Sequence, residues 1–230
     1  MATYYGNWTS DFKRMGSSND YMKGNDGHDS FYGGAGNDII YGDEGNDFLL
    51  GQDGNDGLFG GAGNDFINEY GTFGTDTIRA GSGDDEIHTS LGHGSSVRGD
   101  DGNDIIYNYS QYASIDGGAD NDIIINYGYN AHIEGGTGND QIYATGNGNT
   151  IVTDNSGAFD LVVLDNVSAN ELDVVQVGND LHISSYHDLA DGQSDSGVIL
   201  QDYFTSSDHI EAVFTTEGAG TWVDDLIAFA

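Results

Sequence analysis

The chain contains very few basic residues. Its 230 residues include 5 Lys and Arg against 39 Asp and Glu, which gives a formal net charge of −34, and no basic residue follows Arg98. Nucleic-acid binding begins with clustered Lys and Arg, so the composition excludes a nucleic-acid surface and disfavours an acidic membrane surface. Self-repulsion on this scale destabilises a compact state, and metal cations are the natural source of compensating charge.

Cysteine and proline are absent altogether. Without cysteine the chain has neither disulfides nor thiolate metal sites. Because there are 37 Gly and no Pro, we expect densely repeated tight turns made by residues with positive φ. No apolar run approaches the ~20 residues of a membrane span, and residues 1–10 lack the basic start and apolar stretch of a signal peptide, so we expect any export signal to lie elsewhere.

Catalytic motifs are also missing from the sequence. It contains no HExxH, no GxSxG, no P-loop and no EF-hand spacing. We therefore expect this chain to be non-catalytic, although it could be attached to an enzyme.

What the sequence does contain is a repeat of nine residues. Gapless rows run from residue 24 to residue 68, the register resumes at residue 71 after an insertion of Glu69 and Tyr70, and a ten-residue row covers 89–98. From residue 99 the register continues to 152. The gapless rows read GNDGHDSFY, GGAGNDIIY, GDEGNDFLL, GQDGNDGLF and GGAGNDFIN.

Position 8 of the rows is apolar. Its members are Phe31, Ile40, Leu49, Leu58, Ile67, Ile78, Ile87, Ile106, Ile115, Ile124, Ile133, Ile142 and Ile151, followed by Val162. Alternation along a strand turns this column inward and predicts the core. One buried aliphatic side chain contributes only ~1.5–3 kcal/mol, whereas each ordered residue of a row costs ~1–2 kcal/mol of backbone entropy. Hydrophobic burial alone is therefore not expected to hold the fold together.

Position 6 is Asp in most rows. If two rows form one coil, rows n and n+2 stack, and their carboxylates lie at the ~4.8 Å spacing of neighbouring strands. Carboxylates at so short a distance repel one another unless a hard cation with six to eight oxygen ligands lies between them. The glycine-rich turns offer further carbonyl oxygens as ligands. No column of Cys or His supports zinc or copper. The pattern therefore predicts Ca²⁺ sites.

The rows follow the pattern G-G-x-G-x-D-x-U-x, and over roughly two thirds of its length the chain resembles the RTX family of haemolysin-type calcium-binding repeat proteins. The resemblance implies an all-β fold, a right-handed parallel β-roll in which positions 1–6 form a turn, positions 7–9 form a short strand and two rows complete one coil. It also implies that each Ca²⁺ lies between rows n and n+2. One row supplies the carbonyls of positions 2 and 4 and its Asp, and the other supplies the carbonyls of positions 1 and 3 and its Asp.

The metal ligands implied in this way fall into two groups. The carboxylates of position 6 are Asp20, Asp29, Asp38, Asp47, Asp56, Asp65, Asp76, Asp85, Asp104, Asp122 and Asp140, with Asp11 and Asp160 as weaker terminal members. The turn residues are Asn25, Gly27, Gly33, Gly34, Ala35, Gly36, Gly42, Asp43, Glu44, Gly45, Gly51, Asp53, Gly60, Ala62, Gly81, Gly83, Gly99, Asp100, Asp101, Gly102, Gly117, Gly118, Ala119, Gly135 and Thr137.

Beyond residue 88 the Asp is present only in every second row. Because alternate rows lie on opposite edges, we expect one edge to carry Asp from Asp29 to Asp160 and the other to end at Asp76. The organisation expected from this change is an N-terminal cap (1–14), a β-roll with calcium on both edges (15–88), a β-roll with calcium on one edge (89–163) and a C-terminal β cap with a possible secretion signal (164–230).

The edge without Asp carries Tyr109, Tyr112, Tyr127 and Tyr129. One interpretation is a ladder of aromatic and Asn side chains that fills the turns that lack an ion. We favour this interpretation because rows of tyrosines more often pack against one another than bind a ligand. The alternative is a surface that binds a polysaccharide or another extended ligand.

After residue 164 longer β-patterned runs appear at 172–177, 180–186, 197–204 and 209–216. They predict an antiparallel cap over the open end of the roll, and they resemble the domain that follows the repeats in haemolysin-type proteins. The final residues 224–230, DDLIAFA, resemble the uncleaved C-terminal address of type I secretion substrates. The sequence thus favours a secreted, extracellular bacterial module that folds on Ca²⁺ and supports type I secretion. The alternatives are an adhesion module and the non-catalytic portion of a secreted protease, lipase or alginate epimerase.

Overall fold

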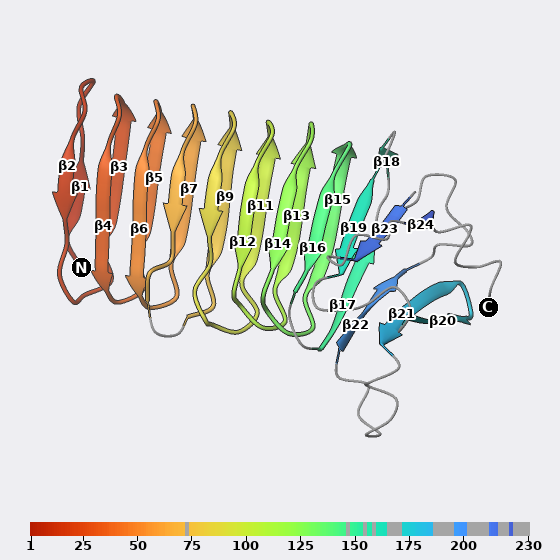
Figure 1. Ribbon diagram of the computed structural model, residues 1–230. Helices are drawn as coiled ribbons and strands as arrows, with labels where there is room; N and C mark the ends of the chain where they lie inside the picture. The colour runs from red at the N-terminus through yellow and green to blue at the C-terminus, as the bar shows by residue number, and fades with distance from the viewer. Residues whose placement is uncertain are drawn as a thin grey trace.

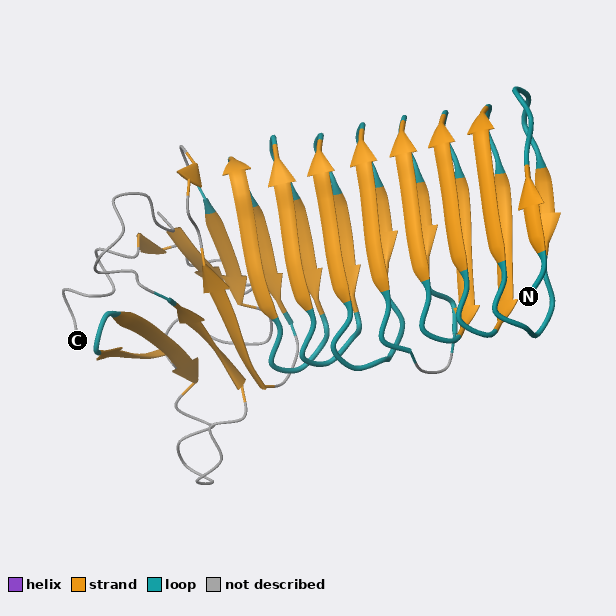
Figure 2. Ribbon diagram, turned by 180° about the vertical axis from the view of Figure 1, so that it is seen from behind, coloured by secondary structure: helices purple, strands orange, loops and turns teal. Residues whose placement is uncertain are grey.

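The computed structural model describes residues 1–71, 74–145, 148–153, 156–157, 160–164, 172–185, 196–201, 212–215 and 221–222. Within these residues the protein is all-β and has no helix. Two sheets face each other along a parallel solenoid, and the chain alternates between them as it winds from one end to the other (Figure 1). Seen from behind, the repeated loops line the two edges where the sheets meet (Figure 2). These observations confirm the all-β β-roll.

The first sheet is formed mainly by the odd-numbered strands. In spatial order they are β1 (Thr3–Tyr5), β3 (Tyr21–Asp26), β5 (Ile39–Glu44), β7 (Gly57–Ala62), β9 (Thr77–Ser82), β11 (Ser96–Asp101), β13 (Ser114–Ala119), β15 (His132–Gly138) and β17 (Gly148–Thr153), then β22 (Ser196–Leu200), β21 (Asp180–Ser185) and β20 (Leu172–Val177), with β18 (Ser156–Gly157) beside β15.

The second sheet contains the strands between them. They are β2 (Phe12–Arg14), β4 (Ser30–Ala35), β6 (Phe48–Asp53), β8 (Phe66–Asn68), β10 (Glu86–His88), β12 (Ile105–Asn108), β14 (Ile123–Asn126), β16 (Gln141–Ala144), β19 (Leu161–Leu164), β23 (Ala212–Thr215) and β24 (Thr221–Trp222).

Neighbouring strands are two rows apart in sequence. Tyr21 pairs with Ile39, and Ile39 pairs with Gly57, in parallel register. Two rows therefore complete one coil, as predicted. The strands are longer than the three residues expected, however, because β5 and most strands of the first sheet continue through positions 1–3 of the following row. Pairs such as Asn25 with Asp43 extend the ladder into what the sequence indicates as a turn.

The core is the column of position 8, as the nine-residue pattern predicts. Its side chains point between the sheets and are essentially inaccessible, from Phe31 and Ile40 to Ile142 and Val162. One expectation was wrong. Ile133 pairs with Val152, and Val152 rather than Ile151 is buried, because the row that ends there is one residue out of register.

The outer faces carry rows of stacked rings. On the second sheet successive coils bring Phe48 against Phe66 and His88 against Tyr107, with centroids 5.1 and 4.4 Å apart. On the first sheet Tyr41 stacks on Phe59 at 4.7 Å. Offset ring pairs of this kind contribute ~0.5–1.5 kcal/mol each, so positions 7 and 9 add lateral cohesion that the core column lacks.

The C-terminal strands first extend the solenoid and then reverse direction. Strand β22 pairs in parallel with β17, whereas β21 pairs antiparallel with both β22 and β20. On the second sheet β23 is parallel to β19 and antiparallel to β24. The predicted antiparallel cap is therefore present in the part of this region that the structure describes, while the suggested secretion signal at 224–230 lies outside it. The described residues contain no helix that could span a membrane.

Candidate metal centres

The position-6 aspartates form two ladders of hydrogen bonds, one on each edge of the solenoid. In each ladder the backbone N–H of one Asp donates to Oδ1 of the Asp one coil further on, at 2.6–3.0 Å. The long ladder lies where strands of the first sheet end and contains Asp11, Asp29, Asp47, Asp65, Asp85, Asp104, Asp122, Asp140 and Asp160. The short ladder lies on the opposite edge and contains Asp20, Asp38, Asp56 and Asp76.

The second carboxylate oxygen, Oδ2, has a different environment. It is buried and accepts no hydrogen bond in Asp29, Asp38, Asp47, Asp56, Asp65, Asp76, Asp85, Asp104 and Asp122. Buried polar atoms are normally hydrogen-bonded, and a buried carboxylate without a partner is strongly unfavourable. A repeated series of such oxygens fits a cation, and oxygen-only donors fit Ca²⁺.

Glycine at position 1 gives these oxygens their space. A Cβ on Gly33 would lie 2.5 Å from Asp38 Oδ2 and 2.7 Å from the carbonyl oxygen of Gly51, which belongs to the next coil. On the other edge, a Cβ on Gly24 would collide with Asp29 Oδ2 and the Gly42 carbonyl oxygen. The glycines therefore leave open the points where a carboxylate of one row and a carbonyl of the next row converge.

The backbone of the Asp-containing turns is left-handed at positions 2 and 4. Asn25 and Asp43 at position 2 have φ of 76°, and Gly27 at position 4 has φ of 129°. Asn, Asp and Gly tolerate this region better than other residues. In the rows without Asp the positive φ moves to position 5, at Gly94, Tyr112 and Asn130. The two kinds of row therefore form different turns, not the same turn with and without a ligand.

Burial raises the pKa values of the ladder carboxyls. The pKa is raised to about 6 for Asp38 and Asp47, to about 7 for Asp56, Asp85 and Asp104, and to about 8 for Asp65 and Asp122. Desolvation is the largest cause, and neighbouring carboxylates add to it. The pKa of Asp20, at the open end of the short ladder, is instead lowered by the hydrogen bond from the Ala2 backbone N–H. Away from that end, the metal-free chain disfavours the ionised form that a cation requires.

An uncharged network replaces the short ladder beyond Asp76. The N–H of Asp76 donates to Ser95 Oγ at 3.2 Å, and the following position-6 residues, Ala113 and Ala131, have no polar side chain. On this edge Thr89, Asn108, Asn126 and Thr150 are linked side chain to side chain at 3.0, 2.7 and 3.0 Å. We call these four residues the amide ladder.

Each Asn of the amide ladder also bonds its own turn. Asn108 Nδ2 donates to the carbonyl oxygen of Ser110 at 3.0 Å, and the Ser110 N–H donates back to Asn108 Oδ1 at 3.1 Å. Asn126 bonds Gly128 in the same way. Both Asn side chains are fully buried. The amides thus tie successive coils together without a charge.

The four tyrosines considered as a ligand surface lie on the same edge. Tyr109 stacks on Tyr127 with centroids 4.9 Å apart and planes 9° from parallel, and Tyr112 lies 6.3 Å from His93. Tyr112, Tyr127 and Tyr129 are exposed. The stacked pair fits packing between coils, while the exposed rings leave a ligand surface open.

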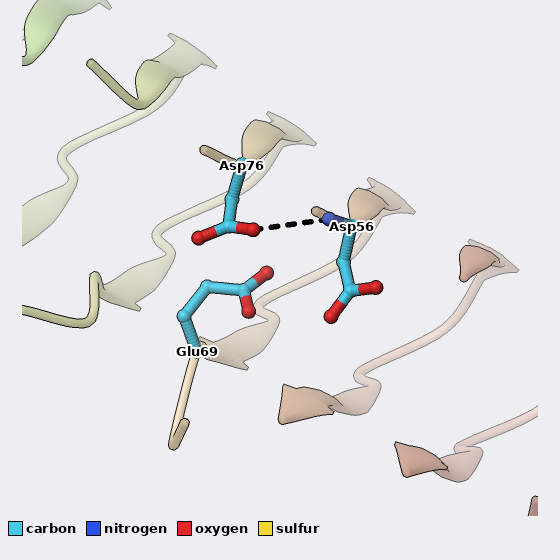
Figure 3. Close-up of side chains that lie close together, drawn as sticks. All are labelled: Asp56, Glu69 and Asp76. Carbon is cyan, nitrogen blue, oxygen red and sulfur yellow. Dashed lines mark hydrogen bonds between the residues drawn. The ribbon is translucent and has the colours of Figure 1, made fainter. Parts of the chain in front are cut away.

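Glu69 lies beside two carboxylates of the short ladder although the sequence pattern does not predict it there. It lies in the two-residue insertion, yet its side chain is only 2% exposed and both carboxylate oxygens are buried without a hydrogen bond. Glu69, Asp56 and Asp76 each offer an oxygen within 4.8 Å of the others (Figure 3). The signal in the sequence is that Glu69 directly follows a strand, at the place where Gly33 and Gly51 stand in the preceding coils.

Comparison with known proteins points to one family. The family model for the RTX calcium-binding nonapeptide repeat (4 copies) matches residues 16–49, 37–67, 70–94, 95–109 and 126–155, together more than half of the chain. No curated protein matches the chain. Among solved structures, the chain is similar to the extracellular lipase LipA from Serratia marcescens, with 17% sequence identity and a TM-score of 0.25. The match covers 91% of this chain and 39% of the lipase chain.

Proposed function

Because the chain belongs to the RTX calcium-binding repeat family, we propose that it is a module that stays unfolded where Ca²⁺ is scarce and folds when it binds Ca²⁺ outside the cell. The observation that carries the proposal is the series of buried Oδ2 atoms without hydrogen bonds along both Asp ladders. Without cations each added coil brings another desolvated carboxylate into the fold. With cations the same coil adds a coordination site.

The ligand sets follow from the family pattern and the observed coils. One ion would be held by the carbonyls of Asn25 and Gly27 with Asp29, and by Gly42, Glu44 and Asp47 of the next coil. On the other edge the corresponding residues are Gly34, Gly36 and Asp38, followed by Gly51, Asp53 and Asp56. The convergence of Asp29 Oδ2 with the Gly42 carbonyl oxygen, and of Asp38 Oδ2 with that of Gly51, supports this arrangement.

The energetics explain a switch between compartments. Extracellular calcium modules bind with dissociation constants of ~10⁻⁴–10⁻³ M, and a ligand that binds only the folded state stabilises it by mass action. At the low Ca²⁺ of a cytoplasm the acidic chain would remain disordered, a form suited to passage through a type I secretion apparatus. RTX repeats are typical of secreted bacterial proteins, which favours an extracellular location.

Far-UV circular dichroism of the chain, with Ca²⁺ and then with an excess of chelator, tests the proposal. We expect strand content to be lost on chelation and to return when Ca²⁺ is restored. Mg²⁺ serves as the control, because its near-octahedral geometry at about 2.0–2.1 Å suits an irregular oxygen cage poorly. Strand content that is unchanged after chelation would contradict the proposal.

This module could serve a larger exported protein. RTX repeats are generally non-catalytic, and the chain spans about two fifths of the lipase chain to which it is similar. A protease, lipase or epimerase domain encoded beside this segment would identify the chain as the calcium-dependent portion of a secreted enzyme. Sequencing of the flanking coding region decides the point.

A further inference from the structure

We propose that Glu69 is a side-chain ligand that closes the last metal site of the short ladder, and that this site binds Ca²⁺ more tightly than the repeated sites do. The inference rests on the proposed function, since it assigns one more ligand within the same series of calcium sites. It concerns a residue outside the nonapeptide pattern.

The first argument is the environment of the Glu69 carboxylate. The side chain is 2% exposed, and neither Oε1 nor Oε2 has a hydrogen-bond partner. Its nearest charged neighbours are Asp56 and Asp76, each with a buried Oδ2 that is equally unpaired. Three desolvated carboxylates side by side are unfavourable unless a cation lies between them.

The second argument is a comparison of two successive coils. At Gly33 the atoms that a Cβ would meet are Asp38 Oδ2 and the carbonyl oxygen of Gly51. At Gly51, one coil further, they are Asp56 Oδ2 at 2.6 Å and the Glu69 oxygens at 2.5 and 2.8 Å. The carboxylate of Glu69 therefore occupies the place that a position-1 carbonyl oxygen takes in the preceding site.

The local backbone explains why a side chain is needed there. Strand β6 spans six residues, but β8 ends at Asn68 after three, so the second half of the ladder is missing in this coil. The backbone N–H of Glu69 still donates to the carbonyl of His88 at 2.9 Å, which keeps the residue in line with its coil.

The geometry fits one Ca²⁺. The three carboxylates each offer one oxygen within 4.8 Å of the others, and ligands of a common Ca²⁺ at about 2.3–2.6 Å lie no further apart than about 5 Å. Figure 3 shows the Glu69 carboxylate between Asp56 and Asp76, which are themselves joined by the ladder bond from Asp56 N to Asp76 Oδ1. Three carboxylates in place of two raise the charge of the site, and affinity rises with ligand charge.

The site of Glu69 also lies at the end of the short ladder. It is the last site of the short ladder, because Asp76 donates next to Ser95 and the amide ladder begins at Thr89. The site therefore lies where this edge changes from Asp carboxylates to the uncharged side chains of the amide ladder.

The test is the substitution Glu69→Gln, with Glu86→Gln as the matched control. Glu86 undergoes the same chemical change but lies on the outer face, where it contacts His88 at 2.7 Å. Equilibrium dialysis with calcium analysis at stepped free Ca²⁺ counts the ions retained by each protein. We expect the unsubstituted chain and Glu86→Gln to retain one ion at free Ca²⁺ about tenfold or more below the midpoint of the other sites, and Glu69→Gln to lose that ion.

A second measurement keeps the inference open to refutation if the variant folds poorly. With chelator present, loss of a buried uncompensated charge is expected to increase residual strand content in Glu69→Gln, while at saturating Ca²⁺ the same variant is expected to melt at a lower temperature. Equal ion counts and equal affinities in Glu69→Gln and Glu86→Gln would overturn the assignment and leave Glu69 as a buried neutral acid. Absence of Ca²⁺ binding by the unsubstituted chain would instead overturn the proposed function.

Discussion

From residue 89 onward the two edges of the solenoid differ. The long ladder continues through Asp104 and Asp122, whereas the opposite edge is joined by Asn108, Asn126 and their flanking threonines. The inward column of position 8 is the same under both edges. The core therefore sets the coil, and each edge can be closed either by carboxylates that need a cation or by amides that need none.

The comparison explains why the requirement for calcium is expected to differ along the solenoid. An Asn satisfies its neighbours with two donors and an acceptor of its own, while an ionised Asp has acceptors only and leaves Oδ2 without a partner. The amide ladder therefore satisfies its own hydrogen bonds without an ion. Segments with Asp on both edges are expected to depend most on Ca²⁺.

The largest expected effect is that of Asp104→Ala, which removes a long-ladder residue where the other edge has no Asp. The Asp85 N–H would lose its acceptor, now 2.8 Å away, and the ions on both sides would lose a ligand. The unpaired N–H alone costs about 1–3 kcal/mol. Urea unfolding at saturating Ca²⁺ measures the loss, and Asp104→Asn, which keeps an acceptor but not the charge, should recover only part of it. Wild-type stability of Asp104→Ala would contradict the ladder.

A smaller effect is expected from Gly99→Ala. Its Cβ would meet Asp104 Oδ2 and the Gly117 carbonyl oxygen, so it fills the metal site without removing a ligand. We expect one ion fewer per chain by equilibrium dialysis. The control is Gly16→Ala, because no atom lies within 4 Å of the Cβ there. The same ion count for both variants would show that position 1 does not border a site.

Asn108→Ala tests the uncharged edge. Removal of the Asn108 amide leaves the Ser110 carbonyl oxygen and Asn126 Oδ1 without their donor, Asn108 Nδ2, which now lies 3.0 and 2.7 Å from them. We expect a loss of about 1–3 kcal/mol in urea unfolding at saturating Ca²⁺, with the number of bound ions unchanged. A change in ion count would mean that the amide ladder takes part in metal binding.

The smallest effect is expected from Tyr127→Ala, which removes the ring stacked 4.9 Å from Tyr109. A loss of about 0.5–1.5 kcal/mol in thermal or urea unfolding would match an offset pair. Screening of extracellular glycans with the parent chain and with a variant in which Tyr109, Tyr127 and Tyr129 are all Ala separates packing from recognition. We expect no glycan to bind; one that binds the parent and not the variant would establish a polysaccharide surface.

Much of the fold follows from the nine-residue period. The period places one apolar residue inward per row and stacks rows n and n+2, because a strand alternates faces and two rows close a coil. Strand length was not predictable from residue types, since Gly, Asn and Asp at positions 1–3 indicate a turn, yet they continue the ladder with a left-handed residue at position 2. The sequence also could not show that Val152 and not Ile151 is buried in the core, because both side chains suit a buried position.

The candidate sites, like the fold, could be predicted from the sequence only in part. The alternation of Asp between edges is readable from the sequence, because it depends only on counting rows. Glu69 was not predicted, because an insertion breaks the count, and only the structure shows that its side chain turns back into the space left by a shortened strand.

The Asp ladders also make the protein a linear polyelectrolyte. Where the carboxyls are ionised, one carboxylate per coil on one edge is a charge about every 4.8 Å along the axis, which is closer than the ~7 Å at which two charges in water interact with thermal energy. A line of charges that dense gathers monovalent counterions, as a nucleic-acid backbone does, and a bound Ca²⁺ must release them. Calcium affinity should therefore fall as salt rises, and it should fall more steeply for the segment with two ladders than for the segment with one.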